Sequence, residues 1–185
     1  MKIRNAVLGA TLALLVLPPV AGAALPKTTD TLIVPAHSIG GVSLGATPKA
    51  VIRAWGKDDA CEYQCLYEGT AGESETPSLA GVLLEKSASG APKVWGAYIS
   101  VGENTAGATS QPNFTTPLAK FKTSKGIGLG STVAELKRAY PAAKKEGSTV
   151  LYSYLLKGPR ESGTTFSFDT DGRVTEIAIR SHPGG

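Results

Sequence analysis

The sequence predicts an α+β protein made of two tandem copies of one unit, each a short helix followed by a three-stranded antiparallel meander, sharing a core. The main observation is a segment at 41–56 that recurs at 126–141 with six of sixteen positions identical. In each copy a capped amphipathic helix is followed by alternating apolar residues. A fixed-period repeat indicates one supersecondary unit per copy. We therefore expect repeat unit 1 over 39–101 and repeat unit 2 over 124–180.

The first residues have the pattern of a secretory signal peptide. Lys2 and Arg4 give a positive start, an apolar run follows, and the small residues at 21–23 suit a cleavage site. The run is shorter than the ~20 residues that cross a bilayer. We expect removal of residues 1–23, an N-terminal segment at 24–38, and a mature protein that is secreted or held in the cell envelope, without a transmembrane segment.

The charge balance argues against a nucleic-acid partner. The whole chain has a formal net charge of +4, and loss of Lys2 and Arg4 with the signal peptide lowers it to +2. Nucleic-acid binding requires a clustered basic face, which so small a charge does not provide. We expect the partner to be another protein outside the cytoplasm.

Each repeat begins with a short helix after a glycine turn. Thr47 and Thr132 stand two residues after a glycine, where an N-cap belongs. Pro48 suits the first helical position, and Glu135 completes a capping box with Thr132. Apolar residues at i, i+3 and i+4 predict that both helices pack on a core.

Alternating apolar residues predict three strands after each helix. The predicted strands are 62–68, 80–86 and 93–101 in the first copy and 150–156, 165–168 and 174–179 in the second. Between the last two runs, Asp171-Gly172 is a hairpin signal. Residues 102–123 begin with a stretch rich in Gly, Thr, Ser, Asn and Pro and are interpreted as a connector, and 181–185 as a flexible tail.

Cys61 and Cys65 are the two cysteines of the chain. In an exported protein such a pair predicts a disulfide, and the short loop that it closes limits its stabilisation to about 2 kcal/mol. The alternative, a metal site, needs further ligands, and the histidines are limited to His37 and His182. We expect a disulfide, no metal and no other cofactor.

The repeats resemble two related groups of proteins through Gly-x-x-Leu-Gly-x-Thr, the helix, the meander and the run 168–174. One group is the β-lactamase-inhibitory proteins, which are secreted and built from two such units. The other is the SmpA/OmlA lipoproteins of the outer-membrane assembly machinery. The tandem arrangement and the lack of a lipid-acceptor cysteine favour the inhibitor-like architecture. The resemblance implies a protein-binding function, and an acidic hairpin residue enters the target site in the inhibitors, with Glu73 the nearest candidate here.

Three motifs allow a chemical interpretation, but each is better explained as a structural turn. Ser43 lies in a Gly-x-Ser-x-Gly pattern with His182 after it, as in a serine hydrolase. The counterpart of Ser43 in the second copy is Gly128, so the pattern serves the backbone. The glycines at 126–130 lack the spacing and lysine of a phosphate loop. The run at 169–172 opens like a calcium loop but lacks the closing glutamate. We expect no catalytic residue.

The two hairpins that follow the first strand of each copy differ in charge. The first carries Glu68, Glu73 and Glu75, and the second carries Lys157 and Arg160. Opposite charges at equivalent positions suggest loops that are available for binding. Two alternatives stay open: both loops are solvated tips, or aromatic residues on an outer sheet face form the binding surface.

The sequence therefore predicts a non-enzymatic, exported protein-binding module, either inhibitor-like or envelope-associated. The alternative function is a small secreted serine hydrolase that uses Ser43.

Overall fold

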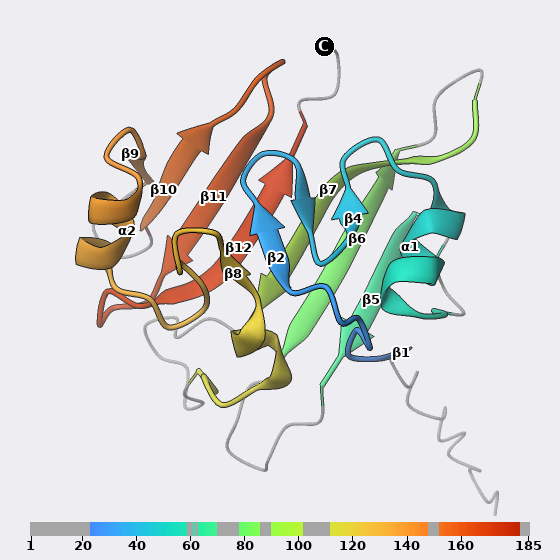
Figure 1. The fold of residues 1–185 in the computed structure, drawn as a ribbon, viewed down its shortest axis with the longest axis horizontal. Helices are drawn as coiled ribbons and strands as arrows, with labels where there is room; N and C mark the ends of the chain where they lie inside the picture. The colour runs from blue at the N-terminus through green and yellow to red at the C-terminus, as the bar shows by residue number, and fades with distance from the viewer. Residues whose placement is uncertain are drawn as a thin grey trace, which may run out of the picture.

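The computed structural model describes residues 23–58, 61, 63–69, 78–85, 90–101, 112–147 and 152–181. Within them, twelve strands form two sheets, one of eight strands and one of four, and two short α-helices accompany them (Figure 1).

The eight-stranded sheet takes strands from both halves of the chain. In spatial order they are β1 (Ala23–Ala24), β5 (Gln64–Glu68), β6 (Leu79–Glu85), β7 (Lys93–Ser100), β12 (Val174–Arg180), β11 (Gly163–Phe168), β10 (Tyr152–Lys157) and β9 (Lys144–Gly147). All neighbours are antiparallel except β1 and β5. The halves meet where β7 pairs with β12, from Ser100 opposite Glu176 to Gly96 opposite Arg180.

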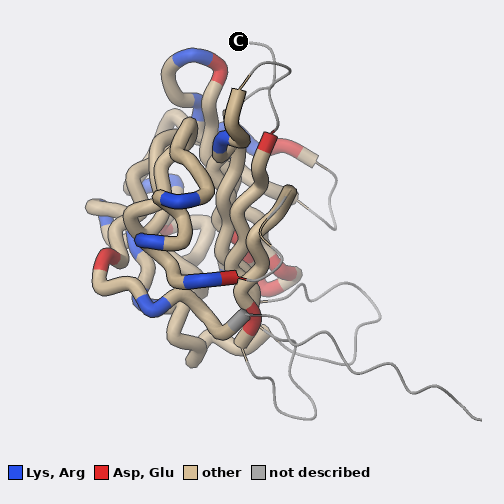
Figure 2. The backbone as a smooth tube through the Cα atoms, turned by 90° about the vertical axis from the view of Figure 1, so that its right-hand side faces the viewer, with Lys and Arg blue, Asp and Glu red and all other residues tan. Residues whose placement is uncertain are grey.

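The four-stranded sheet is built from very short strands. Its order is β4 (Val42–Ser43), β3 (Ser38–Ile39), β2 (Leu32–Val34) and β8 (Lys122–Thr123), with β2 and β8 parallel. This small sheet and the helices lie on the same side of the large sheet (Figures 1 and 2). Residues of both layers therefore share one core.

Capping determines where the two helices begin. The Thr47 side chain accepts a hydrogen bond from Ala50 N before α1 (Pro48–Trp55). Before α2 (Val133–Ala139), Thr132 Oγ1 accepts from Glu135 N, and the Glu135 carboxylate accepts from Thr132 N at 2.7 Å. A 3-10 helix, η1 (Pro117–Lys120), lies between the halves. Helices of eight and seven residues depend on packing for their stability.

The glycine turns before the helices are hydrogen-bonded to the large sheet. Gly45 and Gly130 have φ of 78° and 81°, a backbone region that glycine adopts without a steric penalty. Gly45 N donates to Val94 O at 2.7 Å, and Gly130 N donates to Val174 O at 2.8 Å. Each glycine thus holds a helix start against a strand of the sheet, one in each half.

One face of the large sheet forms the floor of the core. Its strands contribute a buried row that crosses both halves: Tyr67, Ala80, Ile99, Ile177, Phe166 and Tyr154. The helices close the core from above. Trp55 of α1 is buried edge-on against the Tyr67 ring, and Leu136 of α2 is fully buried.

The predicted fold class, two helix-plus-three-strand units in an α+β protein, is wrong. The protein is mostly β, because the helices are short and one sheet runs through both halves. The predicted N-terminal segment and connector also supply strands, since β2 lies in the first and β8 in the second. Strands of two or three residues are too short to show alternation, and pairings between distant strands leave no local pattern.

We expect Thr132→Ala to lower the free energy of unfolding by about 1 kcal/mol, because it removes the N-cap acceptor of α2. Chemical denaturation measures the change. Thr170→Ala, at an exposed turn position, is the matched control and should leave the midpoint unchanged. An unchanged midpoint for Thr132→Ala would show that this cap contributes nothing.

Candidate functional site

The second face of the large sheet carries three rows of side chains that run across the strands. Because side chains alternate along a strand, the residues between the core positions point away from the core. We call this surface the outer face. The acidic row is Glu68, Leu79, Ser100, Glu176, Ser167, Ser153 and Glu146; the central row is Leu66, Gly81, Tyr98, Ala178, Thr165, Leu155 and Lys144; the basic row is Gln64, Leu83, Gly96, Arg180, Gly163 and Lys157.

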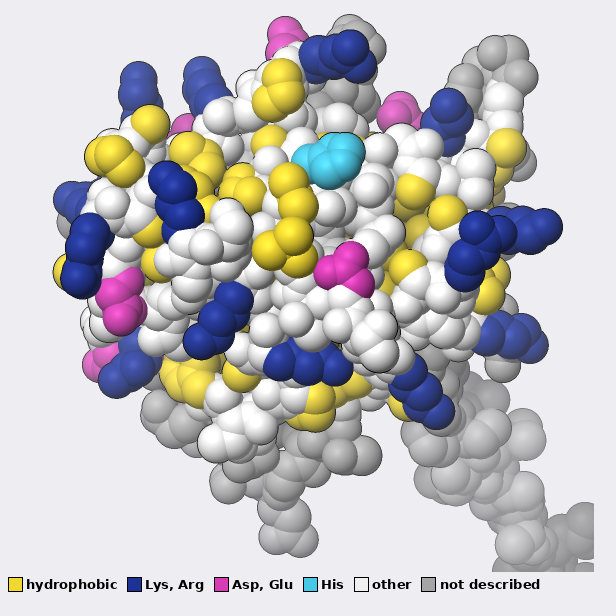
Figure 3. Space-filling model, in the orientation of Figure 1, with side chains coloured by type: hydrophobic (Ala, Val, Ile, Leu, Met, Phe, Trp, Pro, Cys, Tyr) yellow, Lys and Arg dark blue, Asp and Glu magenta, His cyan; other side chains and the backbone are white. Residues whose placement is uncertain are grey.

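The described helices and the small sheet do not lie over the outer face, but Ala178 and Ser100 on this face are buried. Viewed from the side, the helices and the small sheet lie on the other side of the large sheet (Figure 2). Figure 3 shows that other side, where Lys and Arg side chains are spread among apolar ones and outnumber the acidic side chains. The outer face is thus the one large sheet surface that lacks a layer among the described elements.

Tyr98 and Gly81 organise the middle of the outer face. A Cβ atom at Gly81 would overlap the Tyr98 ring, so the ring lies directly on the glycine backbone. Gln64 Nε2 donates a hydrogen bond to the Tyr98 hydroxyl at 3.0 Å. Gly81 therefore lets an aromatic ring lie flat across β6, and Gln64 fixes its outer end.

The surroundings of Tyr98 raise the pKa of its hydroxyl above the ordinary value of 10. Partial burial is the main cause; the Gln64 hydrogen bond lowers the pKa, and the negative charge of Glu176 raises it. The hydroxyl is therefore neutral over the physiological range and offers a hydrogen-bonding group on a largely apolar row.

The charges of the outer face are separated across the sheet. The acidic row holds Glu68, Glu176 and Glu146, and the basic row holds Arg180 and Lys157. Beside the basic row, a hollow of about 430 Å³ is lined by Leu155, Lys157, Gly158, Glu161, Ser162 and Gly163. The outer face thus has an apolar centre between borders of opposite charge.

Two of the predicted binding residues, Glu68 and Lys157, lie on the large sheet. Glu68 ends β5 in the acidic row, and Lys157 ends β10 in the basic row, so they lie at opposite ends of the sheet. Glu73 and Glu75 lie outside the described residues. Glu68 and Lys157 both belong to the outer face, one in its acidic row and the other in its basic row.

Arg160 occupies an unusual turn between β10 and β11. Arg160 and Glu161 have φ of 51° and 61°, a left-handed conformation that suits Asn-Gly far better. Gly158 N donates to Ser162 O at 2.8 Å and closes the turn. A charged pair in a left-handed turn costs stability, and it projects an exposed Arg160 beyond the basic end of the sheet.

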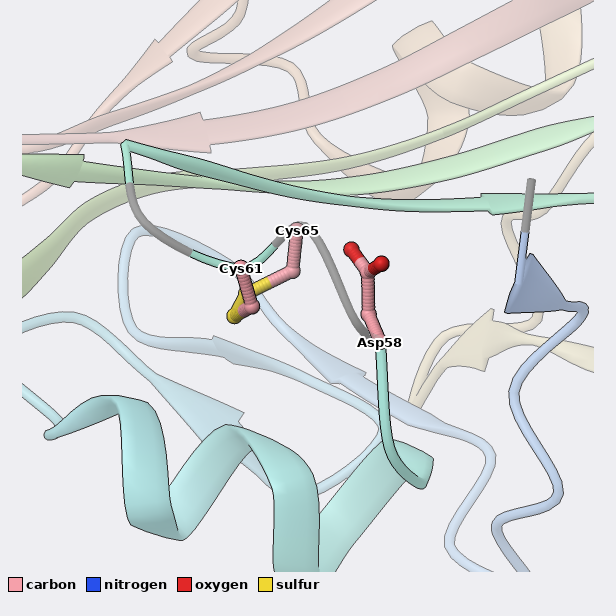
Figure 4. Close-up of side chains that lie close together, drawn as sticks. All are labelled: Asp58, Cys61 and Cys65. Atoms are coloured by element: carbon pink, nitrogen blue, oxygen red, sulfur yellow. A yellow bond between two sulfur atoms is a disulfide. The ribbon is translucent and has the colours of Figure 1, made fainter. Parts of the chain in front are cut away.

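The predicted disulfide between Cys61 and Cys65 is present (Figure 4). Asp58 lies beside the two sulfur atoms, but sulfurs bonded to each other provide no thiolate for a metal. The Asp58 carboxylate accepts a hydrogen bond from Leu66 N at 2.7 Å. Burial, followed by the Asp58 charge, raises the pKa of nearby Tyr67 to about 12. This cluster closes the edge of β5.

The other motifs singled out in the sequence lie in strands and turns. Ser43 is a half-buried residue of the antiparallel edge strand β4, and His37 is exposed in the turn before β3; His182 lies outside the described residues. The Asp169 carboxylate accepts hydrogen bonds from Asp171 N and Arg173 N. That carboxylate therefore shapes the hairpin predicted at Asp171.

The sequence interpretation missed the central residues of the outer face. Tyr98 stands between the buried residues Ala97 and Ile99 of β7. The alternation that predicted this strand therefore also predicted that Tyr98 points to the face opposite the core. Gly81 within a strand pattern was a second signal, because such a glycine often permits a close approach. The local pattern did not predict the order of the strands, and this order is what aligns these residues into rows.

No protein-family model and no curated protein matches the chain. Among solved structures, a DUF4309 family protein (YjgB) from Bacillus subtilis subsp. subtilis str. 168 is similar over 78% of this chain and 84% of its own, with 14% sequence identity and a TM-score of 0.47. An extracellular protein containing a SCP domain from Bacillus anthracis str. Ames is similar over 75% of this chain and 44% of its own, with 11% identity and a TM-score of 0.38. At these TM-scores neither likeness assigns a function.

A search of the described residues for membrane-spanning helices finds none with the length and apolar character that crossing requires.

We expect Gly81→Ala to lower the free energy of unfolding by about 1–3 kcal/mol, because the added methyl group displaces the Tyr98 ring. The Tyr98 ring signals in an NMR spectrum should shift with it. Gly163→Ala is the control on the same face, since its Cβ would come too close to the flexible end of Leu155 and would make an ordinary contact with Leu156 O. Equal effects of the two substitutions would rule out the ring contact as the cause.

Thiol titration of the unfolded, unreduced protein should find no free sulfhydryl, because Cys61 and Cys65 are bonded. Reduction should release two thiols, and the paired variant Cys61→Ser/Cys65→Ser should be less stable by about 2 kcal/mol. Two free thiols before reduction would contradict the disulfide.

Proposed function

We propose that the protein is an exported, non-enzymatic protein-binding module and that the outer face is its binding surface. The observation that carries this proposal is the combination of an apolar central row, with Tyr98 at its middle, and charged rows on both sides. Protein interfaces have this arrangement, an apolar and aromatic core within a polar rim.

The shape of the outer face favours a protein over a small molecule. Neighbouring side chains reach over the glycines of the outer face: Tyr98 over Gly81, Leu83 over Gly96 and Leu155 over Gly163. The hollow beside Leu155 lies between the ends of β10 and β11 and the turn that joins them. A small-molecule site normally encloses most of its ligand, whereas a flat face matches another flat surface.

Export is supported by the signal-peptide pattern of residues 1–23 and by the disulfide, a bond that persists in oxidising compartments. An inhibitor-like protein and an envelope-associated factor share this setting and differ in the partner. In either case the outer face would bind the partner protein, and the identity of that partner would tell an inhibitor from an envelope-associated factor.

Photo-crosslinking tests whether the outer face meets a protein. A benzoylphenylalanine at position 155, in the central row, should give protein adducts in the exported fraction of the producing cell. The same group at Ile52, an exposed aliphatic position on α1, is the control for general collisions and should give none of those adducts. Identical adducts from both positions, or none from position 155, would contradict the proposal.

A further inference from the structure

We propose that the side of the molecule opposite the outer face binds the anionic headgroups of a lipid bilayer, through a basic face formed around α2 and β8. The basic face consists of six exposed side chains: Lys120, Lys122, Lys125, Lys137, Arg138 and Lys145. This inference does not rest on the proposed function, because the outer face lies on the other side of the large sheet.

The positive charge of the chain is concentrated in one segment. Residues 120–147 hold seven Lys and Arg against two Glu, a net charge of +5. The rest of the expected mature chain, 24–119 and 148–185, holds ten Lys and Arg against thirteen Asp and Glu, a net charge of −3. The small net charge of the whole mature chain therefore conceals a separation of charge along the sequence.

The fold brings the first three lysines of this segment together. Lys120 and Lys122 are exposed on either side of the fully buried Phe121, so both point away from the core. The stem of Lys122 lies against Gly128, in the loop that leads into α2. From the same loop, Lys125 Nζ donates a hydrogen bond to the last carbonyl of α2 at 2.7 Å. Lys122 and Lys125 therefore bring the positive charge of β8 and its loop next to α2.

Aromatic rings position two more lysines beside α2. Lys137 Nζ lies 5.6 Å from the centre of the Tyr154 ring, and Lys145 Nζ of β9 lies 4.5 Å from the centre of the Tyr152 ring. The two rings are neighbours, with their centres 6.4 Å apart. Cation–π contacts attract an ammonium group without neutralising it, so both lysines keep their positive charge on this side of the sheet.

The acidic residues of the segment do not cancel this charge. Glu146 points to the outer face. The Glu135 carboxylate accepts hydrogen bonds from Thr132 N and Thr132 Oγ1 in the helix cap, and with Lys125 and Arg138 it lines a hollow of about 350 Å³. A single small anion in that hollow would meet the carboxylate. The cations therefore suit a broad anionic surface better than one enclosed ion.

The composition of the basic face favours a bilayer over other anionic partners. Five of its six cations are lysines, a residue that is depleted in protein interfaces. Leu32 of β2, exposed to 44%, is paired in the small sheet with Lys122 of β8. A bilayer offers phosphates to the lysines and a boundary with acyl chains to the leucine. A nucleic acid or an acidic polymer matches the charge alone.

The expected association is reversible and depends on salt. Each Lys or Arg close to an anionic bilayer changes the binding constant by about fivefold, and this attraction acts over about 8 Å at physiological ionic strength. Figure 3 looks onto this side of the molecule, where the basic side chains outnumber the acidic ones. Several cations on one side can thus hold the protein on a bilayer without a spanning segment.

Co-sedimentation of the purified mature protein with lipid vesicles tests the basic face. Vesicles that contain phosphatidylglycerol should bind the protein at low salt and release it as the salt concentration rises. Vesicles of pure phosphatidylcholine should not bind it. The double variant Lys125→Gln/Arg138→Gln should weaken binding at least about tenfold, because it removes two of the cations.

Lys157→Gln/Arg180→Gln is the matched control, because it removes one Lys and one Arg from the basic row of the outer face. It should leave vesicle binding unchanged, and thermal unfolding shows that each variant is folded. Equal losses in the two double variants would show that net charge alone is responsible and would overturn the basic face. A wild-type protein that ignores phosphatidylglycerol would overturn it too.

A tryptophan reporter shows which side of the molecule meets the bilayer. With anionic vesicles, the fluorescence added by Leu32→Trp should shift to shorter wavelength, because the indole enters a less polar environment. Leu155→Trp, in the central row of the outer face, should keep its emission. A shift for position 155 but not for position 32 would contradict the proposed orientation.

Competition identifies the ligand. Inorganic phosphate should release no more protein from the vesicles than chloride does at equal ionic strength, and a specific release by phosphate would indicate an enclosed anion site instead. Binding to polyglutamate or duplex DNA by a protein that does not bind anionic vesicles would overturn the bilayer as the partner.

Discussion

The pairing of β7 with β12 is the constraint on which the rest of the structure depends. It joins the two halves of the chain edge to edge, and it places Ile99 opposite Ile177 in the core and Tyr98 opposite Ala178 on the outer face. Without it each half would present a long strand edge, which is prone to association. With it, one sheet supplies both the floor of the core and the candidate binding surface.

The remaining elements cover one face of that sheet and protect its edges. The helices and the small sheet close the core, and the glycine turns at Gly45 and Gly130 tie them to the sheet by short hydrogen bonds. At one edge, the Asp58 carboxylate accepts a hydrogen bond from Leu66 N of β5, and β1 pairs with the end of the same strand. At the other, β9 is short and carries exposed lysines, a common defence of edge strands. Protected edges leave the outer face as the main surface for association.

Local features of this structure could be predicted from the sequence, and long-range ones could not. The cap at Thr47, the capping box of Thr132 and Glu135, and the disulfide depend on residues close together in the chain, and the pattern predicted each. The fold class was wrong because the pairing of β2 with β8 joins segments far apart. Glu68 and Lys157 end β5 and β10 before the hairpins β5–β6 and β10–β11, and the strand order is what places them near opposite edges of one sheet. The rows of the outer face exist only once the strand order is known.

Native-state hydrogen exchange tests the central claim, that both halves form one cooperative sheet. In one cooperative structure, the central amides of β7 and β12 exchange last and through the same global unfolding. We expect equal free energies of opening for the most protected amides of the two strands, and both values should fall together with rising denaturant. Two well-separated values, one for the strands of each half, would show that the halves unfold independently and would contradict the continuous sheet.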